Sequence, residues 1–156
     1  MDDMSHLDTQ GNVWMVDVGE KDVTDRVAVA VAVVEMADAT RERLFSEDLP
    51  KGDALAAVRI AAIQAAKRTP DLIPLCHPLS LTSVVVDIAQ IAGGARIAVT
   101  VGVTARTGVE MEAMTAASVG ALVMYDMIKG IDRGARIAGV ELISKAGGRS
   151  GEWHRG

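Results

Sequence analysis

Apolar residues recur along the chain in patterns that predict three clear strands. Residues 26–36 (RVAVAVAVVEM) are dense in valine and contain no breaker. Residues 81–93 and 95–107 are also rich in β-branched residues and meet at Gly93-Gly94, which is a hairpin signal. We therefore expect one strand near the start of the chain and a two-stranded hairpin in its middle.

Two other stretches have the spacing of long helices. Residues 54–68 follow the N-cap candidate Asp53, and the helix is expected to stop at Thr69-Pro70. Residues 112–129 predict a helix rich in alanine and methionine that Gly130 closes. These helices lie between predicted strands, so their apolar faces can pack on a sheet.

Three shorter segments are less clearly patterned. Residues 38–47 predict a short helix, residues 13–19 a short strand or an anchored loop, and residues 137–148 a last strand or a short helix. Without the small helix the order is β-α-β-β-α-β, which is the split βαβ arrangement of ferredoxin-like folds. We expect an α+β protein: an antiparallel sheet with helices on one face and an extra short helix.

This arrangement leaves one face of the sheet uncovered. The strands are rich in valine and poor in charge, so we expect a second subunit to cover that face. A monomer whose sheet is covered by the N-terminal arm is the alternative. A length of 156 residues fits one domain. We predict a flexible arm at 1–12, a ferredoxin-like catalytic domain at 13–150 and a flexible tail at 151–156.

The composition narrows the class of protein. The net charge of −5 argues against a nucleic-acid-binding protein, although a local basic pocket can still bind a small anion. A single cysteine rules out a disulfide within the chain. The N-terminus is acidic and unlike a secretory signal, and the apolar run at 27–34 is too short to span a membrane. We expect a cytoplasmic protein with no membrane partner.

The second long helix places charged residues on one stripe. Six positions at steps of three and four share it: Glu112, Thr115, Val119, Leu122, Asp126 and Lys129. They line a functional surface or, alternatively, the charges are exposed at the helix ends while the middle packs. Glu112 and Asp126 are about 21 Å apart along a straight helix. A long ligand or a second subunit is therefore needed to join them.

Lysines flank the acidic candidate for proton transfer. Asp126 lies near a helix C-terminus, where burial and the dipole raise its pKa while Lys129 lowers it. Such a balance suits proton transfer near neutral pH; the alternative is an ordinary surface ion pair. Lys51 precedes a helix N-terminus, which favours anions, and is a candidate phosphate contact or else a solvated loop lysine.

The chain holds its only cysteine next to a histidine, between two prolines. Pro74 and Pro78 restrict the backbone around Cys76 and His77. A zinc site lacks partner ligands, and neighbouring residues of an extended chain point apart, which disfavours a Cys–His nucleophile. We favour a structural cysteine beside a ligand-binding histidine. A core cysteine beside a histidine satisfied by the protein is the alternative.

Four strings of residues together resemble the MoaC family of molybdenum cofactor biosynthesis. They are MVDVGEKDVTDR, KGD followed by QAAKRTPDLIPLCHPL, TGVEMEAMTAASVGALVMYDMIK and SKAGGRSG. They occur in the family's order and extend over residues 15–151, which is nearly the whole chain. The resemblance implies a ferredoxin-like fold and hexamers built as trimers of dimers, with active sites at subunit interfaces.

The resemblance also implies an activity, which is that of a lyase. Such proteins convert 3′,8-cyclo-7,8-dihydro-GTP to cyclic pyranopterin monophosphate and release pyrophosphate. By resemblance the catalytic residues are Asp126, Lys129 and Lys51, with Lys51 expected from a neighbouring subunit. The substrate-binding residues by resemblance are Leu75, Cys76, His77, Met111, Glu112, Glu110 and Arg26.

No cofactor is expected. A Mg²⁺ ion carried by the triphosphate is compatible with the sequence, which has no acidic metal cage. The expected partner is a small nucleotide. The alternative function is a non-enzymatic module that binds a nucleotide and has a regulatory role.

Overall fold

The computed structural model describes residues 6–156, and the first five residues of the predicted arm lie outside this range. No helix between residues 6 and 156 is long and apolar enough to cross a membrane. The elements in chain order are β1 (Thr24–Glu35), α1 (Asp38–Phe45), α2 (Ala54–Lys67), α3 (Thr69–Leu72), β2 (Ser83–Ile91), β3 (Gly94–Ala105), α4 (Glu110–Ile128), β4 (Arg136–Ala146) and β5 (Trp153–His154).

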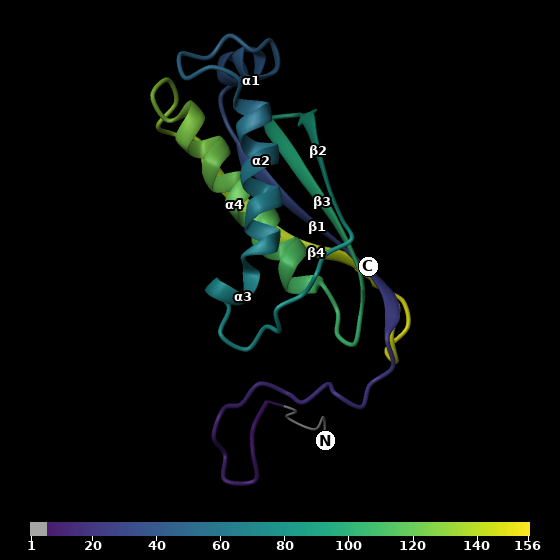
Figure 1. Cartoon of the computed structure of the whole chain (residues 1–156). Helices are drawn as coiled ribbons and strands as arrows, with labels where there is room; N and C mark the ends of the chain where they lie inside the picture. Colours follow the sequence, from purple (N-terminus) through teal and green to yellow (C-terminus); the bar gives the residue numbers. More distant parts are fainter. Residues whose placement is uncertain (1–5) are drawn as a thin grey trace.

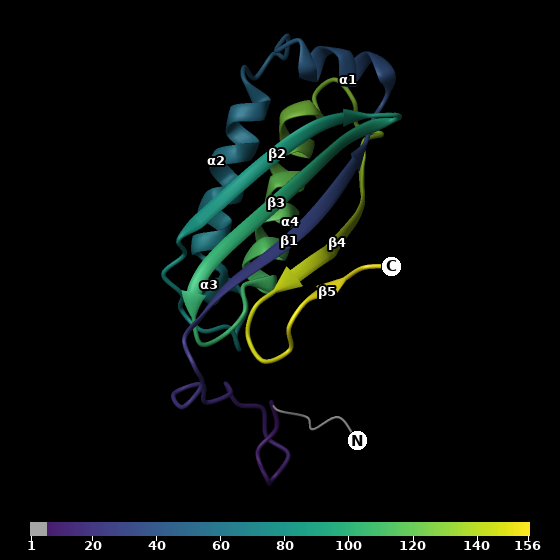
Figure 2. The same ribbon diagram turned by 90° about the vertical axis from the view of Figure 1, so that its right-hand side faces the viewer.

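The strands form one antiparallel sheet in the order β2-β3-β1-β4-β5. The first four strands with α2 and α4 have the connections of a split βαβ unit, so the predicted ferredoxin-like α+β fold is confirmed. Figure 2 shows α2 and α4 together on one side of the sheet. The short helix α1 lies at one end, where β1 leads into α2 (Figure 1).

Small residues let the helices pack close to the sheet. On β1 the inward positions Ala28, Ala30 and Ala32 are at most 1% exposed. Ala30 pairs with Val99 of β3, which is also fully buried. Gly120 of α4 faces α2 and β3, where an added Cβ would meet side-chain atoms at 3.5 to 3.6 Å. Gly120 therefore lets α4 pack closely against α2 and β3.

The face of the sheet opposite the helices is apolar and open. Val29 on β1 and Val85 on β2 both pair with Thr100 of β3, so all three share that face. Val27 and Val85 are 42% and 52% exposed. The prediction of an uncovered apolar face is therefore correct for the part of the chain that the structure describes.

Several local expectations needed the structure to decide them. Residues 137–148 contain strand β4 rather than a helix. Helix α2 ends at Lys67 as expected, but the residues after it form a further short helix, α3, which the pattern did not predict. Residues 13–19 form no strand and take part only in an isolated bridge between Leu7 and Val13. The tail contributes β5, which pairs with β4.

Candidate active site

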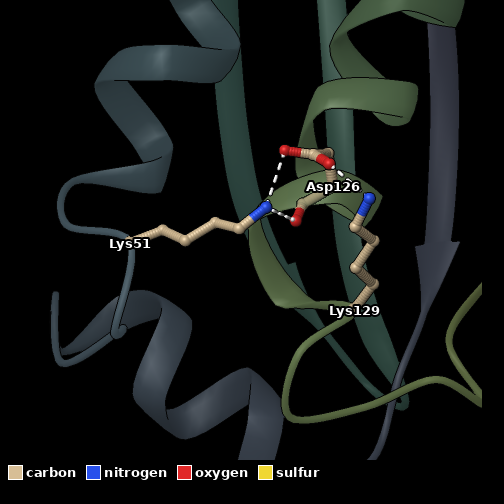
Figure 3. Close-up of polar contacts among 3 residues, drawn as sticks. All are labelled: Lys51, Asp126 and Lys129. Carbon is tan, nitrogen blue, oxygen red and sulfur yellow. Dashed lines mark hydrogen bonds and ion pairs between the residues drawn. The ribbon is translucent and has the colours of Figure 1, made fainter.

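A carboxylate and two lysines meet at the C-terminal end of α4. Lys129 Nζ lies 2.7 Å from Oδ1 of Asp126, and Lys51 Nζ lies 2.8 Å from Oδ2. Lys51 also donates to the backbone carbonyl of Asp126 at 2.6 Å. In Figure 3 Lys51 reaches the carboxylate from the loop before α2, and Lys129 approaches it from the end of α4. The three predicted catalytic residues therefore form one cluster.

The loop that carries Lys51 is held at both ends. Leu49 is buried, and the amide of Gly52 donates to the carbonyl of Leu49 at 3.0 Å. Gly52 takes a φ of 89°, which a glycine adopts without strain. Asp53 then caps α2 by accepting from a first-turn amide at 2.9 Å, as predicted. The expectation that Lys51 comes from a neighbouring subunit is wrong for its contact with Asp126, which lies within one chain.

The ion pairs determine the charge of this cluster. The hydrogen bond from Lys129, followed by that from Lys51, lowers the pKa of Asp126 to about 2. The same contact raises the pKa of Lys129. The side chain of Asp126 is 54% exposed, so burial does not offset the lysines. The predicted near-neutral balance for Asp126 is therefore wrong for this chain, in which the carboxylate is ionised at neutral pH.

A pocket of about 290 Å³ lies at the opposite end of α4. Six of the predicted substrate-binding residues line it, and they come from the loop after α3 and the first turn of α4: Leu75, Cys76, His77, Glu110, Met111 and Glu112. Val16 and Val18, which precede β1, complete part of the wall. No group of three or more His, Cys, Asp or Glu side chains is arranged to hold a metal within residues 6–156.

The proline-flanked loop fixes the orientation of His77. The amide of Cys76 donates to the carbonyl of Ile73 at 3.1 Å, which closes a turn. His77 Nε2 lies 2.8 Å from the carbonyl oxygen of Val16. Because a carbonyl only accepts, Nε2 carries the proton in this contact, and Nδ1 is the nitrogen left for a ligand. The histidine is thus partly satisfied by the protein and still has one free ring position.

The pocket favours neutral forms of its acidic groups. Glu112 is only 3% exposed, and burial raises its pKa, to which the charge of Glu110 adds. Burial also raises the pKa of the Cys76 thiol, with a further contribution from Glu112. A carboxyl group with a raised pKa in a concave site can hold or exchange a proton closer to neutral pH.

Arg26 lies in a second, cationic cleft of about 480 Å³ next to this pocket. Its Nε and Nη2 donate to the carbonyl oxygens of Ala105 and Arg106 at 3.2 and 3.3 Å. The cleft shares Lys21 and Thr107 with the pocket, so the two are neighbours. Four basic side chains line it, with Asp22 as the acidic member: Lys21, Arg26, Arg106 and Arg149.

Sequence reasoning missed several of the charged residues that the fold brings here. Lys145 lies 3.0 Å from Oε1 of Glu110 and ties β4 to the first turn of α4. Lys21, Lys145 and Arg149 all lie within the strings that carry the family resemblance, and Arg106 directly precedes one of them. Their position in those strings was the signal that could have identified them.

The two groups of candidate residues remain separate within one chain. Glu112 and Asp126 are fourteen positions apart on α4, which corresponds to about 21 Å. The structure brings Lys51 and Lys129 to Asp126, and it brings Cys76 and His77 to Glu112, but it joins no member of one group to the other. The fold therefore presents two half-sites at opposite ends of one helix.

The MoaC family model matches residues 15–148. The chain belongs to the MoaC family. Curated relatives of this MoaC-family chain are named "Cyclic pyranopterin monophosphate synthase". One from Roseiflexus castenholzii is 55% identical over 97% of this chain and 98% of its own length. Others are from Rhodospirillum rubrum (51% identical, over 97% and 93%) and Streptomyces coelicolor (53% identical, over 99% and 91%).

Proposed function

We propose that this chain is a lyase of molybdenum cofactor biosynthesis. It converts 3′,8-cyclo-7,8-dihydro-GTP to cyclic pyranopterin monophosphate and releases pyrophosphate. The names of relatives that match nearly the whole chain support this activity. The structural observation that carries it is the cluster of Lys51, Asp126 and Lys129, which gathers two cations and a titratable group from distant segments.

The basic side chains suit the phosphates of this substrate. A triphosphate and a departing pyrophosphate carry charge that lysine and arginine stabilise at fixed positions. Lys51 and Lys129 supply two ammonium groups, and Arg26 lies in a cleft with Lys21, Arg106 and Arg149. His77 and Glu112 of the adjoining pocket then bind the base or the sugar. A nucleotide of this length extends over both regions.

Substrate binding gives Asp126 its proton-transfer role. In the chain alone the two lysines hold the carboxylate ionised, with a pKa of about 2. Phosphate oxygens compete for the same ammonium groups, and a covering subunit removes water from the carboxylate. Both changes raise the pKa of Asp126 toward the range in which it exchanges protons. Asp126 therefore acts as acid and base only in the closed, loaded site.

The active enzyme is a homo-oligomer, and we propose a hexamer built as a trimer of dimers. The half-sites at the two ends of α4 support an arrangement in which one chain supplies the pocket and another supplies the lysine–carboxylate cluster. The open apolar face of the sheet supports assembly as well, because Val27 and Val85 lie exposed on it. The catalytic domain comprises residues 13–150, between the arm at 1–12 and the tail at 151–156.

The proposed enzyme needs no resident cofactor. A Mg²⁺ ion that reaches the site does so on the triphosphate, as part of the substrate, because divalent ions bind phosphate oxygens readily. We place the enzyme in the cytoplasm, a reducing compartment that suits the free thiol of Cys76.

Pyrophosphate release tests the proposal. The purified protein is incubated with 3′,8-cyclo-7,8-dihydro-GTP, and pyrophosphate and pterin product are measured. The wild type turns over, and so does the control Glu42→Ala, which alters an exposed side chain of α1 outside the strings that carry the family resemblance. Asp126→Ala and Lys129→Ala fold and assemble but lose turnover by about 10²- to 10⁴-fold, as expected for a lost proton-transfer group. Substrate binding without pyrophosphate release in the wild type would favour the non-enzymatic alternative.

A further inference from the structure

The chain exposes a row of apolar side chains before β1. Val13, Trp14 and Met15 are 67%, 45% and 46% exposed, and Leu7, which bridges to Val13, is 39% exposed. The hydrogen bonds described for residues 6–14 join this stretch to itself, around a turn at Asp8. In Figures 1 and 2 the stretch runs out from the body of the fold. We call residues 6–16 the leading segment.

The leading segment begins and ends at residues that line the pocket. The carbonyl of Val16 accepts the hydrogen bond from His77, and Val16 and His6 both line the cavity. Trp14 is two residues away, which limits it to about 7 Å of chain from Val16. A second chain that contacts this wall of the pocket therefore lies within reach of Trp14 and Met15.

A matching apolar residue lies next to the other half-site. Leu122 is 57% exposed and precedes Asp126 by one turn of α4, or about 6 Å along the helix. In a composite site the Asp126 cluster of a second copy faces the pocket of the first. Leu122 of that copy then lies within about one helical turn of the joined site, a span similar to the reach of Trp14 from Val16.

We infer that the leading segment of one copy docks on a second copy around Leu122, with Trp14 as its main apolar contact. The partner is a second copy because only another chain brings the lysine–carboxylate cluster to the pocket from which the segment starts. Docking removes exposed apolar surface on both sides, which is favourable by about 25 cal/mol per Å². It also covers the edge of the joined site and keeps water from the lysines. The inference rests on the interfacial site of the proposed function.

Tryptophan fluorescence tests the docking without substrate. The chain has two tryptophans, so Trp153→Phe leaves Trp14 as the only reporter. We expect acrylamide to quench Trp14 severalfold less in the assembled protein, identified by sedimentation velocity, than in diluted single chains. When Leu122→Ser is combined with Trp153→Phe, we expect acrylamide to quench Trp14 as strongly as in single chains, at protein concentrations at which the chains remain assembled. Trp14→Phe leaves Trp153 as a control, whose quenching Leu122→Ser does not change.

The inference is overturned if Trp14 is quenched equally in assembled and single chains. It is overturned too if its protection survives Leu122→Ser, or if the protein sediments as a single chain at every concentration. Because this readout needs no turnover, its failure is separate from that of the proposed function. Equal quenching of Trp14 with normal pyrophosphate release would contradict only the docking. Protection of Trp14 without any pyrophosphate release would contradict only the proposed activity.

Cross-linking gives a second, independent measurement. In a Cys76→Ser background, chains with Trp14→Cys are mixed with chains that carry Leu122→Cys and then oxidised. We expect a disulfide-linked dimer on a non-reducing gel. Ile60→Cys in place of Leu122→Cys is the matched control, because Ile60 is an equally exposed helix residue, at 59%, on α2. No dimer with Leu122→Cys, or an equal yield with Ile60→Cys, would contradict docking at Leu122.

Discussion

Lys51 Nζ lies 2.8 Å from Oδ2 of Asp126, although 75 positions separate the two residues in the chain. The contact joins the loop before α2 to the end of α4, and Lys129 completes it from the same helix. A carboxylate held by two ammonium groups is strongly ionised. Each ammonium group is also positioned to bind an anion that displaces the carboxylate. This arrangement makes several properties of the chain measurable.

The titration of Asp126 should be displaced toward acid. The pKa of Asp126 falls from 3.8 to about 2. Its ion pairs therefore stabilise the folded state fully at pH values above 3.8, and this contribution is lost as the pH falls toward about 2. We predict that the difference in unfolding free energy between wild type and Asp126→Asn shrinks over that interval. Carboxyl-carbon NMR of the substrate-free single chain should show Asp126 titrating near 2, and nearer to 3.8 in Lys129→Ala. Titration of the single wild-type chain at the ordinary value would contradict the cluster.

The reactivity of Cys76 should report on Glu112. Burial raises the pKa of the thiol, and the charge of Glu112 adds to this. We predict that the pH profile for alkylation of Cys76, the only cysteine, is displaced to alkaline pH, and that Glu112→Gln moves it back toward acid. Glu42→Gln, on the exposed side of α1, is the control and should leave the profile unchanged. An unchanged profile in Glu112→Gln would contradict an electrostatic effect of Glu112 on the Cys76 thiol.

The turn after β4 should tolerate no side chain at Gly147. Its φ is 95°, and an added Cβ would collide with the backbone of Asp25 and Arg26. We predict that Gly147→Ala lowers the unfolding free energy by about 1–3 kcal/mol, as expected for a strained residue that must also shift the backbone. Gly151→Ala is the control: its φ is 66°, but no atom lies within 4 Å of the added Cβ. Equal urea midpoints for the two variants would contradict the close approach of the turn at Gly147 to β1.

Gly120 should accept one methyl group and no more. An added Cβ would lie at ordinary contact distances of 3.5 to 3.6 Å from Val58, Ala62 and Ile97. Removing a glycine from a helix interior gains up to about 1 kcal/mol, so we predict that Gly120→Ala raises the urea midpoint. Gly120→Leu should lower it, because the larger side chain overpacks the interface between α2, α4 and β3. A lower midpoint for Gly120→Ala would mean that this interface cannot accept a methyl group.

Most of the fold could be predicted from local signals in the sequence. The valine-rich strand, the hairpin glycines and the Asp53 cap each act within a few residues, so they could be recognised without coordinates. The short helix α3 could not, because Pro70, which predicted a stop, lies in the first turn of α3, where a proline is tolerated. Strand β5 depends on pairing with β4, which no local pattern reveals.

The candidate site was predictable only in part. The helical stripe placed Glu112 and Asp126 on one face and gave their separation, but the resemblance, not the pattern, brought Lys51 to the set. The predicted charge state of Asp126 was wrong. The prediction assumed that the side chain is buried, whereas it is 54% exposed in the single chain. In the proposed assembly, burial of this group depends on contacts with a second chain, which its own sequence pattern does not contain.

Complementation between two inactive variants tests the central claim most directly. Asp126→Ala chains keep the pocket, and His77→Ala chains keep the lysine–carboxylate cluster. If each site takes its halves from different chains, mixed assemblies formed by refolding the variants together should recover about a quarter of wild-type turnover per chain, since random pairing completes one site in four. The separate variants should remain inactive. A mixture with no more pyrophosphate release than the separate variants would contradict the composite site.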